Sequence, residues 1–155
     1  MKSNKSILCK QGYLLKKDQL NKTQLDDIKK DLTVIPYIPG DYGKKKPEKF
    51  KVYRENEDYL AIPKYYGLNK FGKAKKNMEI QGEQINIKFN GSLRPNQEII
   101  MKEILPILEK KDGGLLCLGC GEGKTVLGLY IASIFKVKTL VIVHKTFLLN
   151  QWKER

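Results

Sequence analysis

The sequence predicts an α/β protein, with a small α+β or mostly β module in residues 1–90 and the beginning of a parallel-sheet domain in residues 91–155. In the second segment, helical runs alternate with strand-like runs, as they do in α/β domains. Those strand-like runs are uniformly apolar, which is typical of strands buried on both faces of a parallel sheet. The first segment instead carries short β-branched and aromatic runs separated by proline and glycine. A length of 155 residues fits a small domain plus part of a second one.

The first module is predicted to contain a helix near residues 23–31 and several short strands. Thr23-Gln24-Leu25-Asp26 places a carboxylate three positions after a hydroxyl, which is typical of a helix start, and Ile28 and Leu32 continue the helical spacing. A polar turn between two apolar runs predicts a hairpin over residues 53–60. The strand-like runs of the module are 33–35, 50–53, 59–62 and 85–89.

Residues 65–76 of this module interleave aromatic residues, glycines and lysines. Aromatic rings can stack on bases and lysines can hold phosphates, so the stretch is a candidate nucleic-acid contact. Packing in a core or hairpin is the favoured alternative, since aromatic residues near strands commonly have that role. Lys44-Lys45-Lys46 is expected to be a solvated loop.

The second segment begins with a helix from Pro95, a residue suited to the first helical turn. Its apolar face includes Ile100, Ile104 and Leu108, Pro106 is expected to kink it, and Asp112-Gly113-Gly114 ends it. The elements expected after it are a buried strand over 115–118, a helix over 125–135, a second buried strand over 139–143 and a helix from about 146 to the last residue.

A glycine-rich turn lies between the first of these strands and its helix, with the sequence Gly121-Glu122-Gly123-Lys124-Thr125. A strand, a glycine-rich turn and a helix together form the context in which backbone N–H groups converge on phosphate oxygens. Glycines let the backbone approach the phosphates closely. Lys124 would neutralise the β and γ phosphates of a nucleotide, and Thr125 would offer its hydroxyl to Mg²⁺. The general phosphate-loop pattern has a glycine where this chain has Leu118, although Gly119 follows at once.

Three blocks in a fixed order resemble the superfamily 2 helicases. They are Leu93-Arg94-Pro95-Asn96-Gln97, the loop block from Leu118 to Thr125, and the block from Leu140 to Trp152. These blocks are similar to the Leu-Arg-x-x-Gln element, Walker A and motif Ia of XPB-type DEAD/DEAH helicases and of the related enzymes of large cytoplasmic DNA viruses. The resemblance covers about residues 91–155 and implies the first part of a RecA-like domain.

The resemblance also implies roles for individual residues. Gln97, with Arg94 beside it, would recognise the adenine of ATP, and Lys145 and Thr146 would lie near the nucleic-acid backbone. Trp152 is expected to pack, because it shares helical spacing with Phe147 and Leu148. The residues that would hold the triphosphate and Mg²⁺ are Gly119, Cys120, Gly121, Glu122, Gly123, Lys124 and Thr125.

Phosphoryl transfer requires a carboxylate that holds the metal and arginines that stabilise the transition state. The family supplies the carboxylate from an Asp-Glu-x-Asp/His box on a later strand, but Glu154 is the only acid after residue 125. This chain alone is therefore expected to hydrolyse ATP at a negligible rate. A fragment, a split gene with the remainder as a separate chain, or a decayed copy would each explain the pattern.

The formal net charge of +13, from 30 Lys+Arg against 17 Asp+Glu, suits a polyanionic partner such as nucleic acid. An AT-rich gene would produce a similar lysine excess. Because Arg54, Arg94 and Arg155 are the only arginines, contact with the nucleic-acid backbone is expected in preference to reading of base edges. DNA is favoured over RNA as the partner, on family resemblance.

Cys9, Cys117 and Cys120 are expected to be reduced thiols, because an odd number without a secretory signal argues against a disulfide framework. Cys117 and Cys120 have the spacing of redox and zinc sites, but packing at a strand end is favoured, since His144 is the only histidine. No run approaches the length of a membrane span. An intracellular location is expected: the virion or a cytoplasmic replication site for a viral protein, otherwise the nucleus or cytoplasm.

Two other classes of function remain open. The chain could be a non-catalytic, lysine-rich module that binds nucleic acid through residues 41–80 and uses the glycine-rich loop only for structure. It could also be another phosphate-loop enzyme, such as a kinase, in which Lys124 has a similar role without Gln97.

Overall fold

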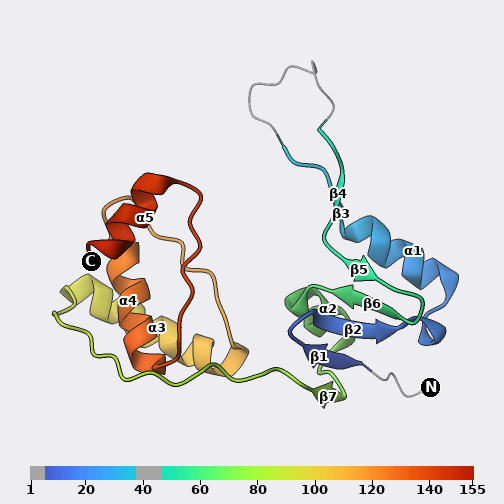
Figure 1. Ribbon diagram of the computed structural model, residues 1–155, viewed down its shortest axis with the longest axis horizontal. Coiled ribbons are helices and arrows are strands. Elements are labelled where there is room, and N and C mark those ends of the chain that lie inside the picture. The colour runs from blue at the N-terminus through green and yellow to red at the C-terminus, as the bar shows by residue number, and fades with distance from the viewer. Residues whose placement is uncertain (1–5, 38–46) are drawn as a thin grey trace. The chain divides into compact units, whose positions relative to one another are not determined.

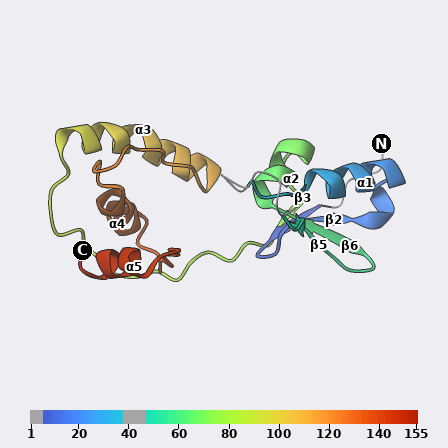
Figure 2. The same ribbon diagram turned by 90° about the horizontal axis from the view of Figure 1, so that it is seen from above.

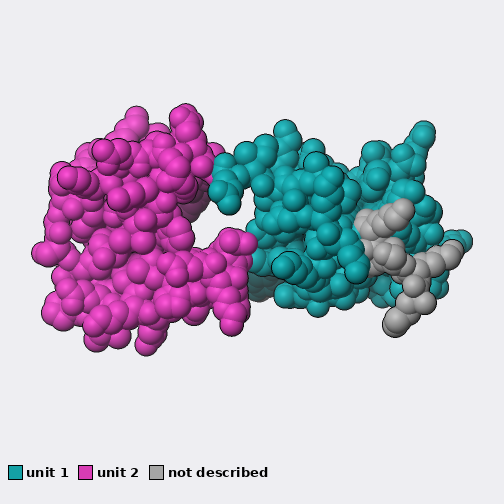
Figure 3. Space-filling model, turned by 90° about the horizontal axis from the view of Figure 1, so that it is seen from below, with its two compact units in different colours: residues 1–81 teal, residues 82–155 magenta. Residues whose placement is uncertain are grey.

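The computed structural model describes residues 6–37 and 47–155, which fall into two compact units. Unit 1 comprises residues Met1–Gln81 and unit 2 comprises Gly82–Arg155 (Figure 3). The two units are described separately below.

Unit 1 is built on a five-stranded sheet in the order β5-β6-β2-β1-β7 (Figure 1). All neighbouring strands are antiparallel except β1 and β7, which are parallel. A separate two-stranded sheet pairs β3 with β4. The strands are β1 (Ile7–Cys9), β2 (Gly12–Lys16), β3 (Thr33–Val34), β4 (Phe50–Lys51), β5 (Arg54–Glu55), β6 (Tyr59–Ile62) and β7 (Lys76–Asn77).

One face of the five-stranded sheet forms the core of unit 1. Alternation along β2 and β6 turns Tyr13, Leu15, Leu60 and Ile62 to this face, where all four are buried. Helices α1 (Lys22–Asp31) and α2 (Lys64–Phe71) both pack against the same cluster, and Figure 2 shows them on one side of the strands. A short 3₁₀ turn, η1 (Lys17–Gln19), connects β2 to α1.

The predicted helix near 23–31 is confirmed, but its predicted cap is wrong. The helix is capped by Asn21, whose side-chain oxygen accepts a hydrogen bond from the Gln24 amide at 2.8 Å. The Gln24 side chain in turn accepts from the Asn21 amide at 3.0 Å, which completes a capping box. Asparagine caps helices at least as well as threonine, so the earlier of two possible caps prevails.

The predicted hairpin over 53–60 is confirmed as β5 and β6. Its turn is held by the side-chain oxygen of Asn56, which accepts from the amides of Asp58 and Tyr59 at 3.1 and 2.7 Å. The strands expected at 33–35 and 50–53 form as the shorter β3 and β4.

Three further expectations for the first module have different outcomes. Residues 85–89 do not form a strand, because the only pairing near them is an isolated bridge between Gln84 and Val137. The aromatic stretch 65–76 begins within helix α2, whose residues Tyr66, Leu68 and Phe71 contact the core, so the favoured expectation of core packing is confirmed for these three residues. Residues 44–46 lie outside the described residues.

Unit 2 contains three helices among its described elements: α3 (Pro95–Lys111), α4 (Lys124–Phe135) and α5 (Thr146–Lys153). Pro95 occupies the first turn of α3, as predicted, and Pro106 lies within that helix. Trp152 of α5 lies against α4, because a Cβ added at Gly128 would come within 2.7 Å of the indole ring.

The buried strands predicted at 115–118 and 139–143 are not formed, which corrects the sequence interpretation. Leu115, Leu140 and Ile142 are 86%, 83% and 85% exposed, and neither run is assigned to a strand. A strand exists only when a neighbour accepts and donates its backbone hydrogen bonds. No such neighbour lies in the described part of unit 2. The mixed α/β class is nevertheless present, with both sheets of the described chain lying in unit 1.

The buried core is distributed unequally between the units. Of the ten buried hydrophobic side chains in the described chain, eight belong to unit 1, whereas only Met101 and Leu127 belong to unit 2. An edge-to-face contact between Phe89 and Tyr130, with ring centroids 5.2 Å apart, adds to the packing of unit 2. None of the helices in residues 6–37 and 47–155 combines the length and apolarity needed to cross a membrane.

Candidate functional site

The glycine-rich loop leads directly into the first turn of α4. Gly121 and Gly123 both have left-handed backbones, with φ of 82° and 80°, and Gly123 is the N-cap of the helix. L-residues with a Cβ avoid this region, which explains the choice of glycine at both positions. A Cβ at Gly121 would meet no atom within 4 Å, so the loop surface is open at that point. The free N–H groups of the first turn of α4 follow immediately, and such groups bind anions.

Residues at the start of α3 hydrogen-bond to this loop. Gln97 is 2% exposed, and its side-chain nitrogen donates to the carbonyl oxygen of Glu122 at 3.1 Å. Its side-chain oxygen accepts from the Arg94 amide at 3.0 Å. Asn96 donates to the Glu122 carboxylate at 3.0 Å on the exposed side. The first turn of α3 therefore holds the loop at Glu122 through two hydrogen bonds.

Lys124 is folded back onto the loop that precedes it. Its ammonium group donates to the carbonyl oxygens of Leu118 and Gly119 at 2.9 and 2.8 Å. Carbonyl oxygens and the oxygens of an anion such as phosphate are both hydrogen-bond acceptors. The ammonium can exchange one set of acceptors for the other without leaving the loop.

A hollow of about 280 Å³ lies beside the loop and is lined by α3, the loop, α4 and the C-terminal segment. Three cationic residues, Arg94, Lys124 and Arg155, contribute to it, and none of its described lining residues is acidic. This charge arrangement suits an anion such as a polyphosphate. The lining residues are Arg94, Gly121, Gly123, Lys124, Thr125, Val126, Leu148, Gln151 and Arg155.

The structure brings together some of the residues expected at the site. Arg94, Gly121, Gly123, Lys124 and Thr125 all line the hollow. The remaining expected residues do not line the hollow. Gln97 contacts the loop at Glu122, Gly119 accepts a hydrogen bond from Lys124 through its carbonyl, and Cys120 is exposed in the turn. Lys145 and Thr146 lie at the start of α5.

Four residues of the hollow, Val126, Leu148, Gln151 and Arg155, were not assigned to it from the sequence. Leu148, Gln151 and Arg155 follow one another at spacings of three and four residues, which place side chains on one face of a helix. That spacing was a usable signal, but only the position of α5 beside the loop gives it meaning. The side of α5 that lines the hollow is therefore a structural finding.

The two cysteines near the loop differ from expectation in their burial. Cys117 and Cys120 are both free and exposed, so the expected packing at a strand end was wrong because that strand is absent. Within the described residues, no group of three or more His, Cys, Asp or Glu side chains is arranged to hold a metal ion.

The chain is similar in sequence to several helicase-named proteins. Residues 90–155 match the family model described as the Type III restriction enzyme, res subunit. The chain is 39% identical over 157 aligned positions to an Acanthamoeba polyphaga mimivirus protein whose name describes an ATP-dependent RNA helicase, L396, covering 97% of this chain and 30% of that protein. It is 43% identical over 70 positions to a helicase-named protein, 161L, of Invertebrate iridescent virus 6, covering 45% of this chain and 16% of the relative.

A third similarity involves a cellular protein. Over 46 positions the chain is 48% identical to the DNA 3'-5' translocase XPB2 of Sulfurisphaera tokodaii, covering 30% of this chain and 10% of that protein. The chain thus spans less than a third of the length of the mimivirus relative.

Proposed function

Residues 90–155 belong to the superfamily 2 helicases of the XPB-like and large-DNA-virus type, and we propose that the chain is the ATP-binding portion of an ATP-dependent helicase or translocase. Family membership supports ATP use and nucleic acid as the partner. The finer assignments below are argued from the site itself.

The observation that carries the proposal is the loop from Gly121 to Thr125 and its lysine. Two left-handed glycines expose backbone around an open surface, and the helix N-terminus follows it. Lys124 lies on the same loop, held only by carbonyl oxygens that phosphate oxygens can replace. Bound there, ATP would supply the phosphoanhydride whose cleavage drives translocation, and these residues would bind and orient its phosphates.

For Mg²⁺, the site offers a partial set of ligands. The Thr125 hydroxyl lies in the hollow and suits a metal bound to phosphates. No described acidic side chain lines that hollow, and the Glu122 carboxylate is engaged by Asn96. We therefore propose that this chain binds ATP weakly and hydrolyses it at a negligible rate. The mimivirus relative is longer than the matched region. We propose that further sequence of that kind, in the same polypeptide or in a separate chain, supplies the carboxylate and the transition-state arginines.

The two residues expected at adenine have different positions. Arg94 lines the hollow and is the better placed of the two for a direct nucleotide contact. Both polar atoms of the Gln97 amide are already engaged with Arg94 and Glu122. We propose that Gln97 contributes to nucleotide recognition chiefly by fixing the loop, and that an adenine contact would require it to release Glu122.

We further propose that Lys145 and Thr146, at the exposed start of α5, contact the nucleic-acid backbone. One relative is named as an RNA helicase and another as a DNA translocase. DNA remains our preferred partner on the resemblance to XPB-type enzymes, since the basic excess suits either nucleic acid. The proposed location is intracellular, with residues 1–90 as a basic accessory module and 91–155 as the helicase part.

Binding of a fluorescent ATP analogue to the whole chain tests the proposal. Lys124→Ala should weaken binding at least about tenfold, because one charge-assisted phosphate contact is worth about 1.5–3 kcal/mol. Lys102→Ala, on the exposed surface of α3, is the matched control and should bind like the parent. Equal binding by the Lys124 variant would contradict the proposal.

The same assay separates the alternatives. A purely structural loop predicts no detectable ATP binding by the parent chain, together with DNA binding that Lys124→Ala leaves unchanged. A phosphate-loop enzyme of another class predicts that GTP competes as well as ATP does.

A further inference from the structure

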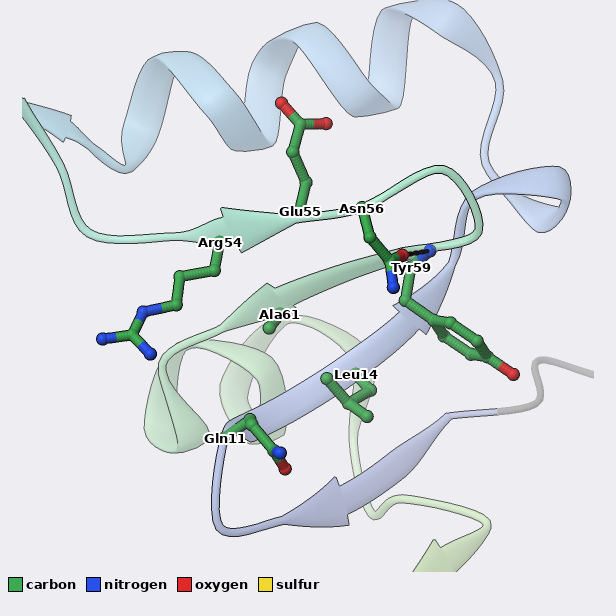
Figure 4. A pocket seen from close by; sticks show the side chains of 7 residues that line it. All are labelled: Gln11, Leu14, Arg54, Glu55, Asn56, Tyr59 and Ala61. Atoms are coloured by element: carbon green, nitrogen blue, oxygen red, sulfur yellow. Dashed lines mark hydrogen bonds between the residues drawn. The ribbon is translucent and has the colours of Figure 1, made fainter.

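The second face of the five-stranded sheet in unit 1 carries no helix from the described residues, because α1 and α2 both cover the opposite face. Strand register sets the side chains of this open face in a row. Arg54 pairs with Ala61, and Ala61 pairs with Leu14, so these three side chains project from the same side. Figure 4 shows this side of the strands with Tyr59 farther along β6.

Two neighbouring hollows share lining residues on this face. One of about 290 Å³ and one of about 400 Å³ share Gln11, Arg54 and Ala61 as lining residues. We call their union the sheet groove. Its side chains include an apolar floor of Leu14 and Ala61 and an aromatic ring, Tyr59.

The two faces of the sheet differ in charge. Arg54, Lys10 and Lys51 line the sheet groove and are all exposed. Glu55, the next residue along β5, projects to the other face, where its carboxylate binds Lys17 at 2.6 Å and Lys29 at 2.8 Å (Figure 4). The one acid at the groove is thereby turned toward α1 and neutralised there.

The cations of the groove are available to a ligand. Among the described residues, the Arg54 guanidinium makes neither an ion pair nor a hydrogen bond, and Lys51 has only a contact with the Tyr53 ring, 5.8 Å from its centroid. An unpaired arginine is the side chain best suited to a bidentate phosphate contact. Lysines beside it add point charges that follow a phosphate backbone without reading sequence.

We propose that the sheet groove binds single-stranded nucleic acid, with phosphates at Arg54, Lys10 and Lys51 and a base against Tyr59. Cations beside a flat apolar and aromatic surface fit a strand whose bases and phosphates alternate. An acidic peptide would use the cations but has no need of the ring. The proposal rests on the proposed function only in naming a nucleic acid as the polyanion, since the groove is in unit 1 and the nucleotide loop is in unit 2.

Binding of a fluorescein-labelled 20-nucleotide oligothymidylate to the whole chain, without nucleotide, tests this inference. Arg54→Ala should weaken binding several-fold and reduce the slope of log affinity against log salt by about one. Tyr59→Ala should weaken binding by about 5- to 100-fold, whereas Tyr59→Phe should bind like the parent. Lys30→Ala on α1 removes a charge from the helical side and is the control that should leave binding unchanged.

Circular dichroism of each variant establishes that it is folded, and Arg54→Lys provides a second, milder variant that should retain most of the binding. Parent-like oligothymidylate binding by both Arg54→Ala and Tyr59→Ala would overturn the proposal. Competition by polyglutamate as effective as that by unlabelled oligothymidylate, at equal charge, would also overturn it in favour of an acidic polypeptide. Lys124→Ala should not alter this binding, so failure of the ATP site and failure of the sheet groove give different results.

Discussion

The side-chain amide of Gln97, at the start of α3, donates to the carbonyl oxygen of Glu122 at 3.1 Å, inside the loop that precedes α4. The oxygen of the same side chain accepts a hydrogen bond from the Arg94 amide. Both polar atoms of Gln97, a residue that is only 2% exposed, therefore have partners. Gln97, 25 positions before Glu122 in the sequence, thus fixes the position of the loop backbone relative to α3.

Replacing Gln97 by alanine should cost about 1–3 kcal/mol of unfolding free energy, because the change removes two part-buried hydrogen bonds that are each worth about 0.5–1.5 kcal/mol. The loop should also lose its support, so binding of a fluorescent ATP analogue should weaken in parallel. Asn96→Ala removes the exposed bond to the same Glu122 and should change either measurement much less. Denaturant unfolding and analogue titration measure both effects, and equal behaviour of the two variants would contradict a special role for Gln97.

The two left-handed glycines of the loop make a matched pair for substitution. Alanine at either position carries a backbone penalty of roughly 1–2 kcal/mol. At Gly123 a Cβ would also overlap the Gln97 side chain, whereas at Gly121 nothing lies within 4 Å. Gly123→Ala should therefore lower stability and analogue binding more than Gly121→Ala does. Thermal unfolding of the two variants, compared with the parent, checks this order, and the reverse order would show that the loop is placed differently.

Glu55 should make unit 1 sensitive to acid. Hydrogen bonds from Lys17 and then Lys29 lower the pKa of its carboxyl group below the ordinary value of 4.5. A carboxyl whose pKa is lowered by folding stabilises the protein above its unfolded pKa, and this contribution is lost as the pH falls through the folded value. Glu55→Gln should therefore show a smaller loss of stability between pH 5 and the acid limit than the parent.

Near neutral pH the Glu55→Gln variant should be weakened by less than about 1 kcal/mol, because the two ion pairs are partly exposed. Urea unfolding at a series of pH values measures both the stability near neutral pH and its loss in acid. Glu57→Gln, in the exposed turn of the same hairpin, is the control. An acid limb that is identical in the parent and the Glu55 variant would refute the assigned linkage.

Local patterns predicted the elements whose stabilising contacts are close in sequence. Helix α1, the β5–β6 hairpin and the left-handed glycine loop each follow from a few neighbouring residues. The runs 115–118 and 139–143 were predicted as strands from apolar character alone, yet strand formation depends on a distant partner that local sequence does not reveal. Their exposure in the structure follows from that dependence.

The candidate site shows the same division. Lys124, Thr125 and the two glycines were identified from their spacing, because the chemistry of phosphate binding is local to a loop and a helix start. Gln97 was found by resemblance, but its burial under Glu122 depends on how α3 meets the loop. Gln151 and Arg155 line the hollow only because α5 packs beside α4, with Trp152 against Gly128. Contacts of this kind are set by tertiary packing.

The unequal division of the core has a consequence for how the chain comes apart on heating. The stability of a folded unit increases with the apolar area that it buries. Unit 1 holds eight of the ten buried hydrophobic side chains in the described chain. Calorimetry should therefore resolve two transitions, the first from the part that carries Lys124. A nucleotide that binds only the native loop would raise that lower transition and leave the upper one in place, so each half of the chain would report on its own ligand.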